Sequence, residues 1–218
     1  MKDAPVAAAP FSWSGFYVGG NIGGAWSDLS HTTTTPAGDA ATLSFDPSSF
    51  AGGVQAGYQV QMGAMVIGLE MGLTGFELSQ RKAFDPAFVA DRTRRVDVDW
   101  LFTLTPRIGF AMDKWMVYLK GGYANADVST SVYNTGNDFQ RTGTNRRQDG
   151  WTIGTGFEYA LNSMVSMGVD YSFVQIDPKA RPAFTQFDPL STTNTGRFSD
   201  VDLHLVTARI NFKLGGGR

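Results

Sequence analysis

The sequence predicts an all-β fold, an eight-stranded antiparallel transmembrane β-barrel with up-and-down meander topology, from two observations. First, apolar residues alternate with small or polar residues in eight stretches of strand length. Second, the connections between these stretches alternate between short and long. Because successive side chains of a strand point to opposite faces, the alternation gives each sheet face its own character. The face with bulky apolar residues ends in aromatic residues on both sides, so we expect it to face lipid.

Each expected strand is defined by the apolar residues of its outward face. The eight strands, with these residues, are 16–26 (Phe16, Val18, Ile22, Trp26), 49–60 (Phe50, Val54, Tyr58, Val60), 65–78 (Ile67, Leu69, Met71, Leu73), 96–111 (Trp100, Phe102, Leu104, Ile108, Phe110), 115–128 (Val117, Leu119, Tyr123), 150–160 (Trp151, Ile153, Phe157, Tyr159), 164–176 (Val165, Met167, Val169, Tyr171, Phe173) and 200–214 (Val206, Ala208, Ile210, Phe212, Leu214). Several exceed the ~9–11 residues that cross a bilayer. We therefore expect their ends to project beyond the membrane.

The connections predict the orientation and the domain boundaries. Tight turns are expected at 61–64, 112–114 and 161–163, and long polar loops at 27–48, 79–95, 129–149 and 177–199. Short turns on the periplasmic side and long loops outside are typical of bacterial outer-membrane barrels, so both termini should be periplasmic. We assign 13–214 to the barrel, 1–12 to a flexible N-terminal tail and 215–218 to a C-terminal tail.

The composition excludes several classes of protein. Hydrophobic residues make up 42% of the chain, the mean hydropathy is −0.15, and no apolar run reaches the length of a spanning helix. The net charge of −2 argues against nucleic acid as the main partner. The absence of cysteine excludes disulfides and a thiol nucleophile.

One inward polar residue is expected on every strand, at a similar height above the short turns. The eight residues are Asn21, Gln55, Glu70, Arg107, Lys120, Glu158, Asp170 and Arg209. Opposite charges fall on neighbouring strands, which predicts the pairs Glu70–Arg107, Lys120–Glu158 and Asp170–Arg209. Buried charges are tolerated when they are paired. We expect a structural ring that plugs the lumen, because eight strands leave room only for side chains. A proton or ion pathway, or a gate, is the alternative.

The loops offer candidate contacts with lipid and with small ligands. Arginine binds phosphate in bidentate fashion, which favours lipopolysaccharide contacts by the basic loop residues Arg81, Lys82, Arg92, Arg94, Arg95, Arg141, Arg146 and Arg147. Histidine and tyrosine can ligate haem iron, so His31, His204 and Tyr133 are ligand candidates, with ordinary solvated side chains as the alternative. No His, Asp and Glu spacing indicates a metal site, and no cofactor is expected.

Catalysis is not expected. A deacylase would need a serine beside a histidine and a carboxylate, and Ser30 next to His31 points to the opposite face of a strand. His204 with Asp200 and Asp202 is a weak match to a barrel protease. We therefore predict a protein that is not an enzyme.

Several blocks of the chain resemble the small alphaproteobacterial outer-membrane proteins that include surface antigens and hemin-binding proteins. The blocks lie at 13–23 (WSGFYVGGNIG), 106–111 (PRIGFA), 118–124 (YLKGGYA), 150–154 (GWTIG) and 208–214 (ARINFKL). The resemblance implies an eight-stranded barrel of the OmpA-like superfamily in the outer membrane of a Gram-negative bacterium.

We expect an envelope-anchoring, surface-interacting protein whose lumen is closed. A hemin or small-ligand receptor and a narrow porin-like channel are the alternatives. Outer-membrane lipids and lipopolysaccharide are the expected partners, and an envelope protein on the wall or loops is a further one. The oligomeric state stays open.

Overall fold

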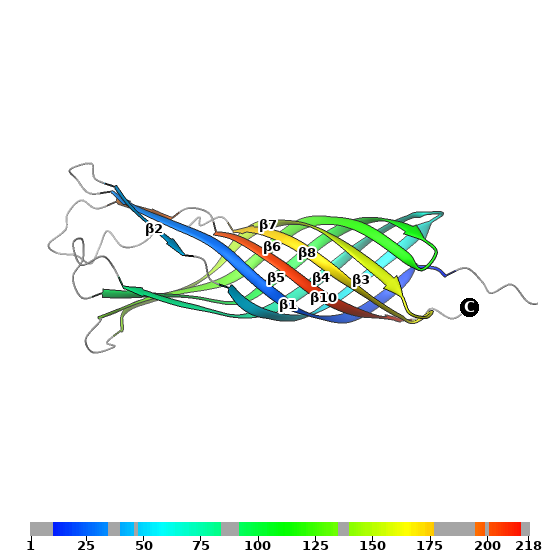
Figure 1. Ribbon diagram of the computed structural model, residues 1–218, viewed down its shortest axis with the longest axis horizontal. Coiled ribbons are helices and arrows are strands. Elements are labelled where there is room, and N and C mark those ends of the chain that lie inside the picture. Colours follow the sequence, from blue (N-terminus) through cyan, green and yellow to red (C-terminus); the bar gives the residue numbers. More distant parts are fainter. Residues whose placement is uncertain are drawn as a thin grey trace, which may run out of the picture.

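The computed structural model describes residues 11–34, 40–45, 48–83, 92–134, 140–176, 195–198 and 201–214. These residues form a closed antiparallel barrel of eight strands (Figure 1), which confirms the predicted fold class. The barrel strands are β1 (Gly15–Thr34), β3 (Ser48–Met62), β4 (Met65–Ala83), β5 (Arg92–Met112), β6 (Trp115–Asn134), β7 (Gln140–Ala160), β8 (Val165–Ile176) and β10 (Val201–Leu214). Neighbours in this order pair with one another, and β10 returns to pair with β1. Among the described residues, no helix is long and apolar enough to cross a membrane.

The strands continue into segments that the sequence predicted as loops. β4, β5, β6 and β7 are 19 to 21 residues long. Two further strands, β2 (Ala40–Phe45) and β9 (Thr195–Phe198), pair with the far part of β1. The predicted bounds of the long polar loops, 27–48, 79–95, 129–149 and 177–199, were therefore wrong for these strand residues. Polar composition indicated loops, but ladder hydrogen bonds are made by the backbone and can continue outside lipid.

Three tight turns join strands at the end of the barrel where β1 begins and β10 ends (Figure 1). Gly63 follows β3 with a φ of 64°, a left-handed conformation that suits glycine. Asp113 follows β5 with a φ of 54°. In the turn after β7, the Asn162 side chain accepts hydrogen bonds from the backbone N–H groups of Met164 and Val165, at 2.8 and 2.9 Å. These local interactions fix the turns without long connections.

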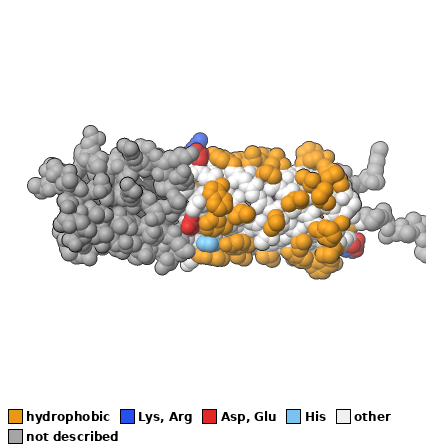
Figure 2. Space-filling model, turned by 90° about the horizontal axis from the view of Figure 1, so that it is seen from above, with side chains coloured by type: hydrophobic (Ala, Val, Ile, Leu, Met, Phe, Trp, Pro, Cys, Tyr) orange, Lys and Arg blue, Asp and Glu red, His pale blue; other side chains and the backbone are white. Residues whose placement is uncertain are grey.

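The outer wall is apolar and bounded by aromatic belts. Figure 2 shows hydrophobic side chains spread along the described part of the barrel, with charged groups at its two ends. Exposed aromatics lie at the long-loop end (Trp26, Phe50, Trp151) and at the short-turn end (Phe16, Tyr58, Phe110, Trp115, Phe212). Large exposed apolar residues lie between them, among them Ile22, Val54, Leu69, Leu119 and Val169. An apolar wall of this kind is favourable in contact with the hydrocarbon core of a bilayer.

Candidate functional site

The inward face carries a cluster of six charged side chains, one from each of six strands. They are Glu70 on β4, Arg107 on β5, Lys120 on β6, Glu158 on β7, Asp170 on β8 and Arg209 on β10. Strand alternation directs these residues inward because their immediate neighbours, such as Leu69 and Ile108, face outward. Five of the six are buried, and the Lys120 side chain is 13% exposed. The lumen cluster, as we call these six residues, carries three acids and three bases.

Glu70 is the centre of the lumen cluster. Its carboxylate lies 3.1 Å from an Arg107 nitrogen and 3.8 Å from the Lys120 ammonium, and it also contacts Arg209 Nη2. The Tyr17 hydroxyl donates to Glu70 Oε2 at 2.7 Å. A buried carboxylate with this many donors meets the condition under which buried charge is stable.

Glu158 joins the cluster to the polar groups nearer the short turns. Arg107 Nη2 lies 3.0 Å from Glu158 Oε1. The other carboxylate oxygen accepts from the Ser166 hydroxyl and from the Asn211 amide, both at 3.1 Å. Asn211 in turn accepts from the Gln55 amide at 2.8 Å.

The two uncharged residues predicted for the ring take part in the same network. Asn21 donates to Gln55 at 2.7 Å, and Gln55 is linked through Asn211 to Glu158. The structure thus connects all eight predicted lumen residues in one set of hydrogen bonds and ion pairs.

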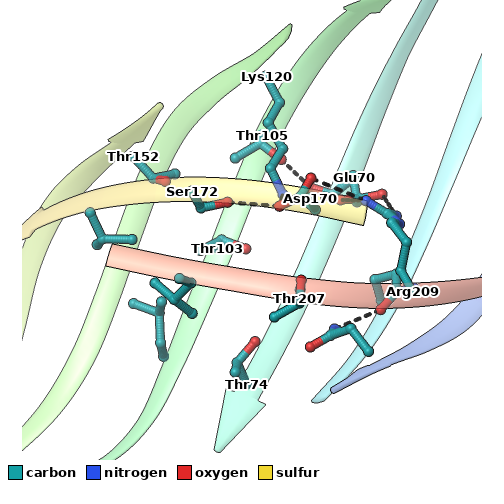
Figure 3. Close-up of a pocket in the computed structure, with 16 residues that line it drawn as sticks. Glu70, Thr74, Thr103, Thr105, Lys120, Thr152, Asp170, Ser172, Thr207 and Arg209 are labelled. Atoms are coloured by element: carbon teal, nitrogen blue, oxygen red, sulfur yellow. Dashed lines mark hydrogen bonds and ion pairs between the residues drawn. The ribbon is translucent and has the colours of Figure 1, made fainter. Parts of the chain in front are cut away.

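The predicted pairing is wrong for Lys120. Its ammonium lies 2.8 Å from Asp170, not beside Glu158. The strand register explains the difference, because Lys120 lies opposite Gly154 whereas Glu158 lies opposite Met116, four residues away. Gly154 has no side chain, so the lysine stem passes over it and reaches Asp170 on β8 (Figure 3). Glu70–Arg107 and Asp170–Arg209 are close, at 3.1 and 3.6 Å.

Two buried tyrosines that the sequence analysis missed complete the cluster. Tyr118 donates to Asp170 at 2.7 Å and accepts from Arg209 at 2.8 Å, and its ring lies 4.0 Å from the Arg107 guanidinium carbon. Tyr17 accepts from Arg107 at 3.0 Å. Each tyrosine lies opposite a glycine, Gly57 for Tyr17 and Gly156 for Tyr118, and a Cβ there would overlap the ring. Inward tyrosines facing inward glycines are a signal that the sequence already held.

A small polar cavity lies beside the cluster, toward the long-loop end. Its volume is about 50 Å³. Figure 3 shows Lys120, Asp170 and Arg209 at this cavity together with hydroxyl side chains. The hydroxyl residues are Thr74, Thr103, Thr105, Thr152, Ser172 and Thr207. A polar cavity of this size has room for a few water molecules.

Two apolar layers bracket the lumen cluster. The layer toward the long-loop end contains Ala25, Ala51, Phe76, Leu101, Ala124, Ala126, Val174, Ile176, Leu203 and Leu205. The layer toward the short turns contains Trp13, Val66, Ala111, Met116, Tyr118 and Ala160. Trp13 belongs to the segment before β1, and Gln59 donates to its carbonyl at 2.8 Å. Phe11 and Ser12, assigned to the tail from the sequence, also contact the barrel through Lys213.

The other predicted site residues lie at or beyond the long-loop rim. Arg147 is exposed, and its guanidinium carbon lies 5.7 Å from the Trp100 ring centre. His204 lies on the outer wall, where its Nδ1 is 2.9 Å from the Tyr171 hydroxyl. The side chains of His31, Tyr133, Arg81, Lys82, Arg92, Arg94, Arg95, Arg141 and Arg146 fall outside the described residues. Within the described part, no three His, Cys, Asp or Glu side chains form a group that could hold a metal ion.

A closed antiparallel barrel with an apolar outer wall and a polar, charged interior is the architecture of transmembrane proteins of bacterial outer membranes. The chain belongs to the outer membrane protein beta-barrel domain family, whose model matches residues 4–206. This membership confirms the predicted family and the outer-membrane location.

Two relatives and one solved structure illustrate the similarity. The 31 kDa outer-membrane immunogenic protein of Brucella melitensis is 28% identical, and the match covers 96% of this chain and 88% of that protein. The 22 kDa outer membrane protein of Rhizobium leguminosarum is 27% identical over 82% of this chain and 71% of its own. The barrel OprG of Pseudomonas aeruginosa has a similar fold, with a TM-score of 0.50 and 14% identity, covering 94% of this chain and 98% of OprG.

Proposed function

We propose that this protein is a closed barrel that anchors in the outer membrane and presents its long-loop end to the exterior as an interaction surface. The observation that supports this proposal is the filled lumen. The lumen cluster lies between two apolar layers, and the cavity beside it measures only about 50 Å³. In this proposal the protein is neither a diffusion pore nor an enzyme.

Planar-bilayer recording tests the closed lumen. The purified, refolded barrel should insert without giving stable ohmic steps, because ions would have to cross two apolar layers. Insertion is checked separately by the heat-dependent shift of the folded barrel on gels. Reproducible single-channel steps of one size from inserted wild-type protein would contradict the closed lumen and support the porin-like channel instead.

We further propose that Arg147 contacts a lipopolysaccharide phosphate. Its guanidinium lies beside Trp100 at the long-loop rim, where a bidentate donor can meet phosphate oxygens. Arg147→Glu should weaken the retention of lipopolysaccharide by the refolded barrel on native gels. Lys114→Glu, an equal charge change in the turn between β5 and β6, serves as the control. Equal retention by the wild type and by Arg147→Glu would exclude this contact.

A further inference from the structure

Four of the eight methionines of the chain lie at the short turns. Met62 and Met65 flank the turn between β3 and β4, Met112 ends β5, and Met164 immediately precedes β8. Methionine is among the residue types that are most often fully buried in proteins. These four side chains are nevertheless 51%, 40%, 54% and 59% exposed, in that order. The packing of a core therefore does not explain why methionine occupies these positions.

The strand register brings three of the four onto one small area of the outward face. Met62 and Met65 lie directly opposite each other on β3 and β4. Met65 lies opposite Phe110 on β5, and Met112 is two residues further along β5 on the same face. Directly opposed residues of antiparallel strands have Cβ atoms about 4.5–5.5 Å apart, and diagonal neighbours about 7–8 Å. We refer to Met62, Met65 and Met112 as the methionine triad.

The methionine triad lies at the outermost part of the short-turn end, which hydrophobic side chains reach in Figure 2. Met62 is four residues beyond the belt residue Tyr58 on β3, about 13 Å along a strand that rises ~3.3 Å per residue. The backbone N–H of Ala111 donates to the Ala64 carbonyl at 2.7 Å, so β5 stays hydrogen-bonded to the turn between β3 and β4. We therefore expect the triad to meet water at the rim of the barrel, on a backbone that holds its three members close together.

The chemistry of the thioether group points to one class of ligand. Thioether sulfur is a soft donor that selects Cu(I), whereas Mg²⁺ and Ca²⁺ prefer oxygen ligands. The methionine side chain is unbranched and rotates about three bonds, so sulfur atoms from neighbouring backbone positions can converge on one ion. In the described part of the chain, no three His, Cys, Asp or Glu side chains are grouped to hold a metal, so a harder divalent ion has no comparable site there.

We propose that the methionine triad binds a Cu(I) ion at the short-turn rim, with the three thioethers as its ligands. A thioether has no proton to lose, so the affinity should not depend on pH in the way that the affinity of a histidine or cysteine site does. In the orientation expected for outer-membrane barrels this rim faces the periplasm, which would supply the ion. The site depends on the barrel and its register, and it is independent of whether the lumen is closed.

Methyl NMR of the methionines tests the proposal at the site itself. The barrel, refolded in an uncharged maltoside detergent, is titrated with silver nitrate in chloride-free buffer, because Ag(I) shares the charge and softness of Cu(I) and needs no reductant. The methyl signals of the triad should shift together and saturate at one ion per barrel, and Cu(I) kept reduced with ascorbate should shift the same signals. Buried Met116 and the wall residues Met71 and Met167 should not respond. Zinc nitrate should shift none of these signals.

Met65→Leu and Met164→Leu form a matched pair, since leucine has a similar volume and lacks the sulfur. Met65→Leu should raise the half-saturating silver concentration by roughly tenfold or more, because even the outer-shell partners of metal ligands contribute that much to affinity. Met164→Leu removes an exposed thioether from a different turn and should leave this concentration unchanged. If Met65→Leu does not fold, Met112→Leu replaces it. An unchanged midpoint for the triad variant, a Met164 signal that shifts with the same midpoint as the triad, or a response to zinc would overturn the proposal.

Discussion

Glu70 lies within ion-pair distance of all three cations of the lumen cluster, so we expect the cluster to be sensitive to the loss of its charge. Glu70→Gln keeps the shape of the side chain but leaves Arg107, Lys120 and Arg209 with fewer counter-charges. We expect the free energy of unfolding to fall by ~3–5 kcal/mol, as when one partner of a buried pair is removed. Urea unfolding in lipid vesicles, followed by tryptophan fluorescence, measures the change.

Lys120→Met is the comparison variant, since Lys120 is the most exposed member and Asp170 retains Tyr118 and Ser172 as donors. It should destabilise less than Glu70→Gln. In a double-mutant cycle, the coupling free energy of unfolding between Lys120→Met and Asp170→Asn should reach ~0.5–3 kcal/mol, the range for residues in contact. The coupling free energy between Lys120→Met and Glu158→Gln should be smaller. A larger coupling with Glu158→Gln than with Asp170→Asn would contradict the observed pairing of Lys120 with Asp170.

At the scale of elements, the segment before β1 forms a cover over the short-turn mouth. Trp13 is 3% exposed, its indole donates to the Asp113 carbonyl at 3.2 Å, and its backbone N–H donates to Gln61 at 2.8 Å. A cavity of about 20 Å³ lies beside it and is lined in part by Ser166. We expect this cover to limit the access of water to the lumen cluster from that side.

Trp13→Ala should open this mouth to water. The chain has no cysteine, so Ser166→Cys gives a single reporter thiol behind the cover. Adding Trp13→Ala should speed labelling by a polar maleimide roughly tenfold or more, because burying a large apolar side chain contributes ~1.5–3 kcal/mol.

Ser163→Cys, on the exposed turn between β7 and β8, is the control and should react equally fast with and without Trp13→Ala. If the Ser166→Cys labelling rate is the same in both backgrounds, Trp13 does not form the seal.

At the scale of the whole molecule, the two ends of the barrel differ in a way that predicts its orientation. The tight turns, the start of β1 and the end of β10 share one end, and strands longer than a bilayer requires extend from the other. Short connections lie on the periplasmic side in bacterial outer-membrane barrels. We therefore expect the long-loop end to face the exterior.

Cysteine labelling in cells measures this orientation. An impermeant thiol reagent should label Asn137→Cys, between β6 and β7, on intact cells. It should label Ser163→Cys only after the outer membrane is permeabilised. Labelling of Ser163→Cys alone on intact cells would reverse the assignment.

The sequence by itself determined the closed barrel, its eight strands and their order. The alternation of apolar and polar residues can be recognised within a single strand. An outward face made of Ile67, Leu69, Met71 and Leu73 is favourable only in contact with lipid. It also placed the six lumen charges inward, since inward direction follows from the same alternation.

Only the tertiary structure decided which of these charges meet. Arg209 reaches Glu70 across 139 residues, and Lys120 passes over Gly154 to Asp170, because register and closure set the heights at which inward groups face each other. The contributions of Tyr118 and Trp13 depend on the same closure. The alternation along a strand determines whether a side chain points into the lumen or toward lipid. Which side chains it contacts depends on the strand register and on barrel closure, which bring distant strands together.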